Sequence, residues 1–200
     1  MASALDVRCR SLADFLTWER QQPDRYERIS GVVRMMTGGT IDHNRIALNV
    51  ATALRQRLRG SCETFVSDVK VVSPEEDVVY PDVVVVCGDI PGKATELELP
   101  VVVFEVLSES TAGPKRWVYQ TIPSLEHYVL VDQNKPVAEV ASRDDDGSWR
   151  SVLHRGLDGH VQLEALGVEI GLDEVFARII FAPAAEPDGA CADGVDGRPG

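Results

Sequence analysis

Two carboxylates stand inside otherwise apolar stretches of this 200-residue chain. Asp82 follows Pro81 within the run VVYPDVVVVC (78–87), and Glu105 interrupts VVVFEVLSEST (101–111). A buried carboxylate without a partner costs several kcal/mol, so it is rarely kept unless a partner or a metal ion stabilises it. Taken alone, Pro81-Asp82 could be a turn that enters a strand, and Glu105 could be a structural acid in a salt bridge.

Taken together, the two acids predict a shared site. If their strands are neighbours, Asp82 at the start of one and Glu105 near the end of the other meet only when the strands are antiparallel. The short connection over residues 88–100 makes such a pairing natural. Two carboxylates at the end of a sheet form a hard, oxygen-rich site, which is the type that Mg²⁺ or Mn²⁺ prefers.

The hydrophobic pattern predicts the elements that must position these acids. A capping box at Ser11 predicts a short helix to Glu19, and apolar residues at helical spacing predict a second helix over 42–59 that Gly60 ends. The remaining expected elements are a hairpin over 26–36, strands over 63–72, 82–87, 101–107 and 127–132, a helix over 115–120, a hairpin of 136–141 with 149–154, and closing segments over 168–172 and 175–181.

This order predicts an α/β fold with a mixed β-sheet flanked by helices, preceded by an N-terminal helix and hairpin. We expect residues 1–182 to form a single domain. Residues 183–200 are rich in Ala, Pro, Gly and Asp, a composition that predicts a disordered tail.

Charge and cysteine content limit the function classes. The net charge of -12 argues against a broad electrostatic surface for nucleic acid, although a local basic cleft or a metal ion stays compatible with it. The four cysteines have no zinc-site spacing, and their dispersal predicts free thiols in a reducing cytoplasm. We expect a cytoplasmic protein that does not enter the membrane, because no apolar run approaches the length of a membrane span.

The chain resembles a known nuclease family. Pro81-Asp82 followed by Glu105 is similar to the PD-(D/E)xK nuclease pattern, and PDVVVVC, FEVLSEST, PSLEHYVLVD and YERISGVV resemble the Uma-two-type restriction endonuclease family. The resemblance covers roughly residues 11–181. It implies a restriction-endonuclease-like core, with Asp82 and Glu105 as ligands of Mg²⁺ or Mn²⁺.

The resemblance also implies a catalytic lysine. The superfamily pattern places this lysine two residues after the glutamate, but this chain has Leu107 there. The family instead has a K-x-x-x-Y motif on the following helix. Lys115 and Tyr119 match that motif. The segment between Thr111 and Lys115 is about one helical turn shorter than in the family. Lys115 is therefore either catalytic or a surface lysine, and Lys70 is the substitute candidate.

Glu27 and His43 match further family positions. The resemblance suggests that Glu27 approaches the metal, and the alternative is a strand acid paired with an arginine. His43 either contacts phosphate or caps its helix, and capping is the interpretation we favour.

Two functions remain open from the sequence. The first is a divalent-metal-dependent endonuclease that hydrolyses phosphodiester bonds of DNA. The second is a catalytically weakened nuclease fold that serves as a binding or accessory module. A homodimer is expected for the first, because nucleases that cut both strands often act as pairs and C₂ symmetry is the default for homo-oligomers.

Overall fold

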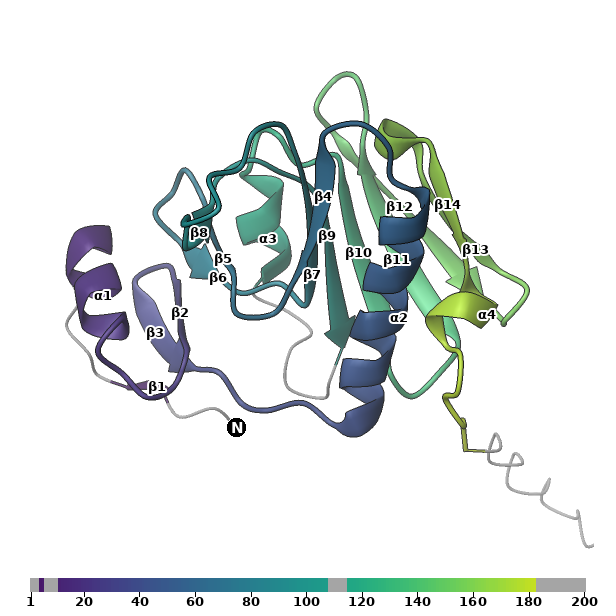
Figure 1. Ribbon diagram of the computed structural model, residues 1–200, viewed down its shortest axis with the longest axis horizontal. Coiled ribbons are helices and arrows are strands. Elements are labelled where there is room, and N and C mark those ends of the chain that lie inside the picture. The colour runs from purple at the N-terminus through teal and green to yellow at the C-terminus, as the bar shows by residue number, and fades with distance from the viewer. Residues whose placement is uncertain (1–3, 6–10, 108–114, 183–200) are drawn as a thin grey trace, which may run out of the picture.

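The computed structural model describes residues 4–5, 11–107 and 115–182. These residues form two six-stranded sheets, a two-stranded sheet and four α-helices (Figure 1). The predicted tail over 183–200 lies outside the described residues, as does the short segment before Lys115. None of the described helices combines the length and the apolar character that crossing a membrane requires.

The central sheet is mixed and carries both acids. Its order is β12-β11-β10-β9-β7-β4, in which β9 and β10 are parallel and the other neighbours are antiparallel. Its strands are β4 (Cys62–Val66), β7 (Val83–Cys87), β9 (Pro100–Leu107), β10 (His127–Asp132), β11 (Val137–Arg143) and β12 (Trp149–Arg155).

Helices cover the two faces of this sheet. Successive strand residues point to opposite faces, and one set packs on α2 (Ile41–Arg57) while the other packs on α3 (Lys115–Gln120) (Figure 1). Both faces are therefore buried, which explains why β7 and β9 are nearly continuous runs of valine.

The second sheet lies beside the first and is built from the N-terminal hairpin and short strands. Its order is β1-β3-β2-β6-β5-β8. Its strands are β1 (Ala4–Leu5), β2 (Tyr26–Ile29), β3 (Val32–Met35), β5 (Lys70–Val72), β6 (Val78–Val79) and β8 (Glu96–Leu97). Helix α1 (Leu12–Glu19) packs on it through the fully buried Phe15.

The C-terminal part closes the α2 side of the core. It consists of β13 (His160–Leu163), a 3₁₀ turn (Glu164–Leu166), β14 (Val168–Gly171) and α4 (Leu172–Val175). The closing segment expected over 168–172 contains β14. Strand β13 was not expected, although its buried residues alternate with exposed ones as in a half-buried strand.

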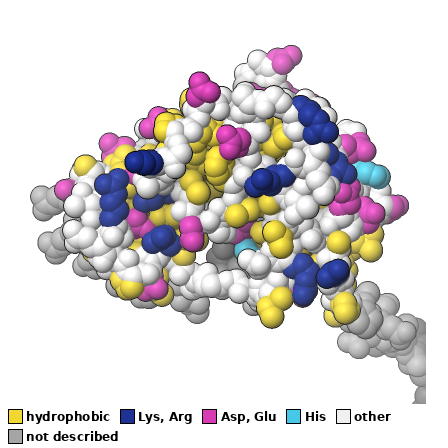
Figure 2. Space-filling model, in the orientation of Figure 1, with side chains coloured by type: hydrophobic (Ala, Val, Ile, Leu, Met, Phe, Trp, Pro, Cys, Tyr) yellow, Lys and Arg dark blue, Asp and Glu magenta, His cyan; other side chains and the backbone are white. Residues whose placement is uncertain are grey.

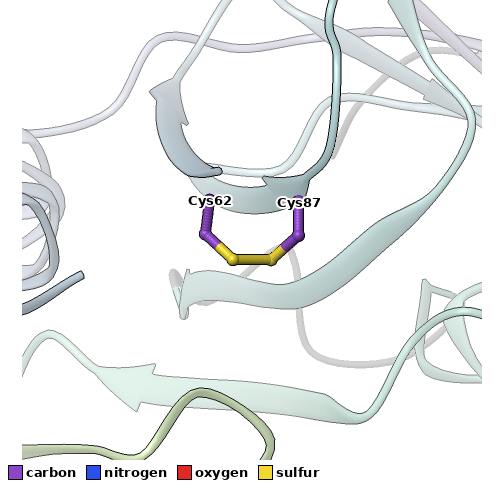
Figure 3. Close-up of a disulfide and its surroundings, with 2 residues drawn as sticks. All are labelled: Cys62 and Cys87. Atoms are coloured by element: carbon purple, nitrogen blue, oxygen red, sulfur yellow. A yellow bond between two sulfur atoms is a disulfide. The ribbon is translucent and has the colours of Figure 1, made fainter. Parts of the chain in front are cut away.

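Three expectations about local structure were wrong. The strand expected over 63–72 is divided between the two sheets, because Asp68 takes a positive φ of 78° that ends the extended backbone. Helix α2 ends at Arg57, before Gly60, since Leu58 returns to extended backbone with ψ 141°. Cys62 and Cys87, expected as free thiols, form a disulfide across β4 and β7 (Figure 3).

Candidate active site

Asp82 and Glu105 lie opposite each other on neighbouring strands. β7 and β9 are antiparallel with Val83 paired to Phe104, so the residue before Val83 faces the residue after Phe104. This is the antiparallel pairing that the short connection predicts. Pro81 fits here because it precedes the strand and therefore leaves the ladder of hydrogen bonds intact.

Two side chains of α3 hold the carboxylate of Glu105. The residue is only 3% exposed, and Tyr119 Oη donates a hydrogen bond to its Oε1 at 2.6 Å. Lys115 Nζ lies 3.2 Å from Oε1 and 3.4 Å from Oε2. Because Lys115 and Tyr119 are four residues apart, they share one face of the helix, and that face meets Glu105.

Lys115 also binds a carboxylate from the other sheet. Its Nζ lies 2.7 Å from Oε1 of Glu27, which belongs to β2. The same Oε1 accepts the backbone N–H of Tyr80 at 3.0 Å. Glu27 is thus paired with a lysine, contrary to the arginine alternative, and Lys115 is a buried residue, contrary to the surface alternative.

His43 approaches Asp82 from the first turn of α2. Its Nε2 lies 3.4 Å from Asp82 Oδ2, and that oxygen also accepts the backbone N–H of Val106 at 2.7 Å. The expected capping role of His43 was wrong. Thr40 is the N-cap, because its hydroxyl accepts the backbone N–H of His43 at 3.1 Å, which leaves the imidazole ring available to Asp82.

The crowding of acids perturbs their protonation. Burial, helped by the charges of Asp82 and Glu27 and opposed by Lys115 and Tyr119, raises the pKa of Glu105 to about 7. Burial disfavours the ammonium form of Lys115, but the carboxylates of Glu105 and Glu27 outweigh burial and raise the pKa of Lys115. The hydrogen bond with Asp82 raises the pKa of His43.

Lys70 lies in a different buried cluster. Its Nζ is 2.8 Å from Glu19 Oε2, and Tyr80 Oη donates to Glu19 Oε1 at 2.7 Å. Lys70 is therefore already paired and contacts neither Asp82 nor Glu105. Tyr80 connects this cluster to the candidate site, because its backbone N–H binds Glu27 and it precedes Pro81-Asp82 in the chain.

Oxygen donors and excess negative charge suit the site to a divalent cation. The described residues contain no group of three or more His, Cys, Asp and Glu side chains placed to hold a metal ion. However, Mg²⁺ commonly uses only one or two carboxylates and completes its shell with water and phosphate. Burial is the main cause of the raised pKa of Glu105, and the charges of Asp82 and Glu27 add to it. The donor set therefore fits Mg²⁺ or Mn²⁺, with Asp82 and Glu105 as the residues that would hold it.

Several residues of this arrangement escaped the sequence analysis. Neither Tyr80 nor Glu19 has a sequence spacing that reveals its role, because their contacts join segments about 50 to 60 residues apart. A signal was present for Thr40, since Thr followed by a helical pattern is a common N-cap.

Comparison with known proteins links the chain to nucleases. Residues 12–174 match the model of the Uma2 family, whose description is "Putative restriction endonuclease". Two proteins of Synechocystis sp. (strain ATCC 27184 / PCC 6803 / Kazusa) are similar over most of their length. The uncharacterized protein slr1290 is 29% identical over 84% of this chain and 92% of its own. The uncharacterized protein sll1609 is 31% identical over 68% of this chain and 82% of its own.

A solved structure has the same fold. It is the crystal structure of a "putative nuclease belonging to DUF820" from Anabaena variabilis ATCC 29413, with a TM-score of 0.66 and 15% sequence identity. The match covers 85% of this chain and 99% of that one. The mixed α/β fold with helices flanking the sheets therefore agrees with a restriction-endonuclease-like nuclease, as the sequence predicts.

Proposed function

The chain belongs to the Uma2 family of restriction-endonuclease-like proteins, and we propose that it is a divalent-metal-dependent endonuclease that hydrolyses phosphodiester bonds of DNA. One observation carries the proposal. The carboxylates of Asp82 and Glu105 stand on opposed positions of adjacent strands, and a buried lysine lies against Glu105. A structural pair of acids would not need to be kept together in this way, because like charges in a buried site repel each other.

The metal would supply the charge that this chemistry needs. When bound, Mg²⁺ or Mn²⁺ polarises a phosphate oxygen, lowers the pKa of a bound water and neutralises the leaving oxyanion. Asp82 and Glu105 would hold it with carboxylate oxygens. Val106 N–H and His43 fix the direction of the Asp82 carboxylate, and the Tyr119 hydroxyl fixes that of Glu105.

Lys115 supplies a fixed positive charge beside these acids. Its raised pKa keeps the ammonium charged at neutral pH. A preorganised cation at this place stabilises negative charge that develops on the phosphoryl group and orients the attacking water. Glu27 holds the ammonium from the opposite side, so we assign it the role of positioning Lys115.

The charge distribution limits how the substrate is held. On the face drawn in Figure 2, Lys and Arg side chains form separate groups among acidic and apolar ones and do not make one continuous basic surface. With a net charge of -12, most of the protein repels a polyanion. We therefore expect DNA binding that depends on the metal and, without a continuous basic surface, weakens only modestly with salt. We also propose a homodimer, which light scattering would test.

A second function has its own support. Glu105 is nearly inaccessible, and both of its oxygens are already engaged by Lys115 and Tyr119. This closed arrangement favours a nuclease fold with weakened catalysis that serves as a binding or accessory module.

A nuclease assay separates the two functions. Duplex DNA, single-stranded DNA and RNA are incubated with Mg²⁺, with Mn²⁺ or with EDTA, and cleavage is followed on gels. The endonuclease should cut at least one DNA form with metal only, and Asp82→Asn should abolish cutting. Asp146→Asn, in the exposed turn before β12, is the matched control and should remain active. DNA binding without any cleavage would support the accessory module instead.

A further inference from the structure

The disulfide joins the end of β7 to the start of β4 at the edge of the central sheet (Figure 3). Cys62 and Cys87 are directly opposed in the antiparallel ladder. Neither residue contributes to the candidate active site, since Asp82 lies at the opposite end of β7.

The ladder between β4 and β7 continues with main-chain hydrogen bonds at both of its ends, one of them past the disulfide. Five consecutive residue pairs connect β4 and β7. Past the cysteines, Gly88 N–H donates to the carbonyl of Ser61 at 3.0 Å, and at the far end Ser67 N–H donates to the carbonyl of Asp82 at 3.2 Å. The strands are therefore held together without the disulfide, so the bridge can open while the sheet stays paired.

A cavity gives access to one of the two cysteines. Cys62 lines a cavity of about 200 Å³ together with Arg55, Leu58, Glu63 and Thr64. Arg55 is an exposed residue of α2, and its guanidinium places a positive charge on the cavity wall. Along β4 the side chain of Glu63 alternates with those of Cys62 and Thr64 and points to the other face of the sheet. The cavity therefore offers the cation of Arg55 beside Cys62.

The sulfur of Cys87 lies on the same face of the sheet as that of Cys62, because the two residues are directly opposed and bonded. Cys87 is not among the residues that line the cavity of Arg55, so a reagent that enters this cavity meets Cys62.

We propose that the Cys62–Cys87 bridge is a thiol–disulfide exchange site whose reactant is a small thiol bearing carboxylates. The thiol enters the cavity beside Arg55, which binds a carboxylate. This site is separate from the proposed nuclease function and does not depend on it.

The exchange is balanced in two steps. The thiolate of the small molecule attacks Sγ of Cys62, which forms a mixed disulfide there and releases Cys87 as a thiolate. A second small thiolate attacks the sulfur of the bound molecule, which releases a small-molecule disulfide and the thiolate of Cys62. The two small thiols lose two electrons in total, and the protein disulfide gains them.

Reduction rates test the role of charge. The full chain is prepared with Cys9→Ser and Cys191→Ser, which removes the two other cysteines. Reduction of the bridge is followed by alkylation and intact mass, with glutathione as the anionic thiol and cysteamine as the cationic one. Arg55→Gln should slow glutathione by about threefold, as for loss of one unit charge about 6 Å away in water, and should not slow cysteamine. Arg59→Gln, two residues past the end of α2 and outside the cavity lining, is the matched control and should change neither rate.

Single-cysteine variants test which sulfur reacts. Oxidised glutathione should modify Cys62 in the Cys87→Ser chain faster than Cys87 in the Cys62→Ser chain. Circular dichroism of the chain that carries both changes should retain the native spectrum. The proposal is overturned if air-oxidised protein contains no bridge, if Cys87 reacts as fast as Cys62, if Arg55→Gln slows both thiols equally, or if the chain without the bridge unfolds.

Discussion

Substitution of Lys115 tests the central arrangement of the candidate site. Lys115→Met removes the ammonium that Glu27 and Glu105 share at 2.7 Å and 3.2 Å. Breaking a buried ion pair by removing one partner costs about 3–5 kcal/mol, because the remaining charge is left uncompensated. We expect a loss of this size in the free energy of unfolding at pH 8, in the absence of metal.

The loss should depend on pH in a defined direction. Glu105 has a pKa of about 7 in the folded protein and an ordinary value of 4.5, so the folded state binds more protons between these values. Its contribution to stability is therefore fully present below about pH 4.5 and falls as the pH rises to 7. Without Lys115 the pKa of Glu105 rises further. The difference in the free energy of unfolding between variant and wild type should therefore continue to grow above pH 7, by about 1.4 kcal/mol per pH unit.

Urea unfolding followed by circular dichroism measures these differences, from pH 5 to pH 9, with and without Mn²⁺. Lys70→Met is the matched control, because Lys70 is a buried lysine paired with Glu19 at 2.8 Å outside the site. Burial alone would raise the pKa of Glu19, but Lys70 opposes burial and lowers this pKa. The stability that the pair contributes is therefore present above about pH 4.5 and is lost as the pH falls. The decrease in the free energy of unfolding of Lys70→Met should already be present at pH 5, and Mn²⁺ should not restore it.

Mn²⁺ should restore stability in Lys115→Met, because a cation held by Glu105 and Asp82 replaces part of the missing charge. The reasoning would be refuted if Lys115→Met were as stable as the wild type at pH 8. It would also fail if the variant lost the same stability at every pH, since the carboxylates would then not be coupled to the lysine.

Three further predictions concern the same structure. Mn²⁺ at 100 times its Kd should raise the free energy of unfolding of the wild type by about 2.7 kcal/mol, and Asp82→Asn or Glu105→Gln should abolish this gain in thermal unfolding. Tyr119→Phe should cost about 1–3 kcal/mol in urea unfolding, because it removes a buried hydrogen bond to Glu105, and an unchanged midpoint would contradict that bond. Reduction of Cys62–Cys87, which are 25 residues apart, should lower the free energy of unfolding by about 3.5 kcal/mol on the chain-entropy model, and equal stability of oxidised and reduced protein would count against the bridge.

The parts of the fold that the sequence predicts are those that depend on local pattern. Helix α3 begins and ends where the sequence analysis placed it, at Lys115 and Gln120, and Ser11 caps α1 through its hydroxyl group. The opposed positions of Asp82 and Glu105 could also be predicted, because a short connection between adjacent strands leaves few alternatives to antiparallel pairing.

The parts that could not be predicted depend on contacts between distant segments. No periodicity shows that β4 and β5 separate into different sheets, since the break rests on one residue with positive φ at Asp68. The pairing of Cys62 with Cys87 follows from strand register, which the isolated cysteine positions do not contain. Glu27 reaches Lys115 only because the hairpin of the second sheet docks beside α3.

The hydrogen bond from Tyr80 N–H to Glu27 allows the exchange of one backbone amide to report whether the candidate site is assembled. Glu27 belongs to the second sheet, and Tyr80 belongs to the link that carries the chain into β7. Any fluctuation that moves the Glu27 side chain away from this link breaks the bond and loosens the pair of Glu27 with Lys115. Amide hydrogen exchange reports such openings residue by residue, and their free energies lie below that of global unfolding. The exchange rate of the Tyr80 amide should measure how often the site comes apart in an otherwise folded molecule.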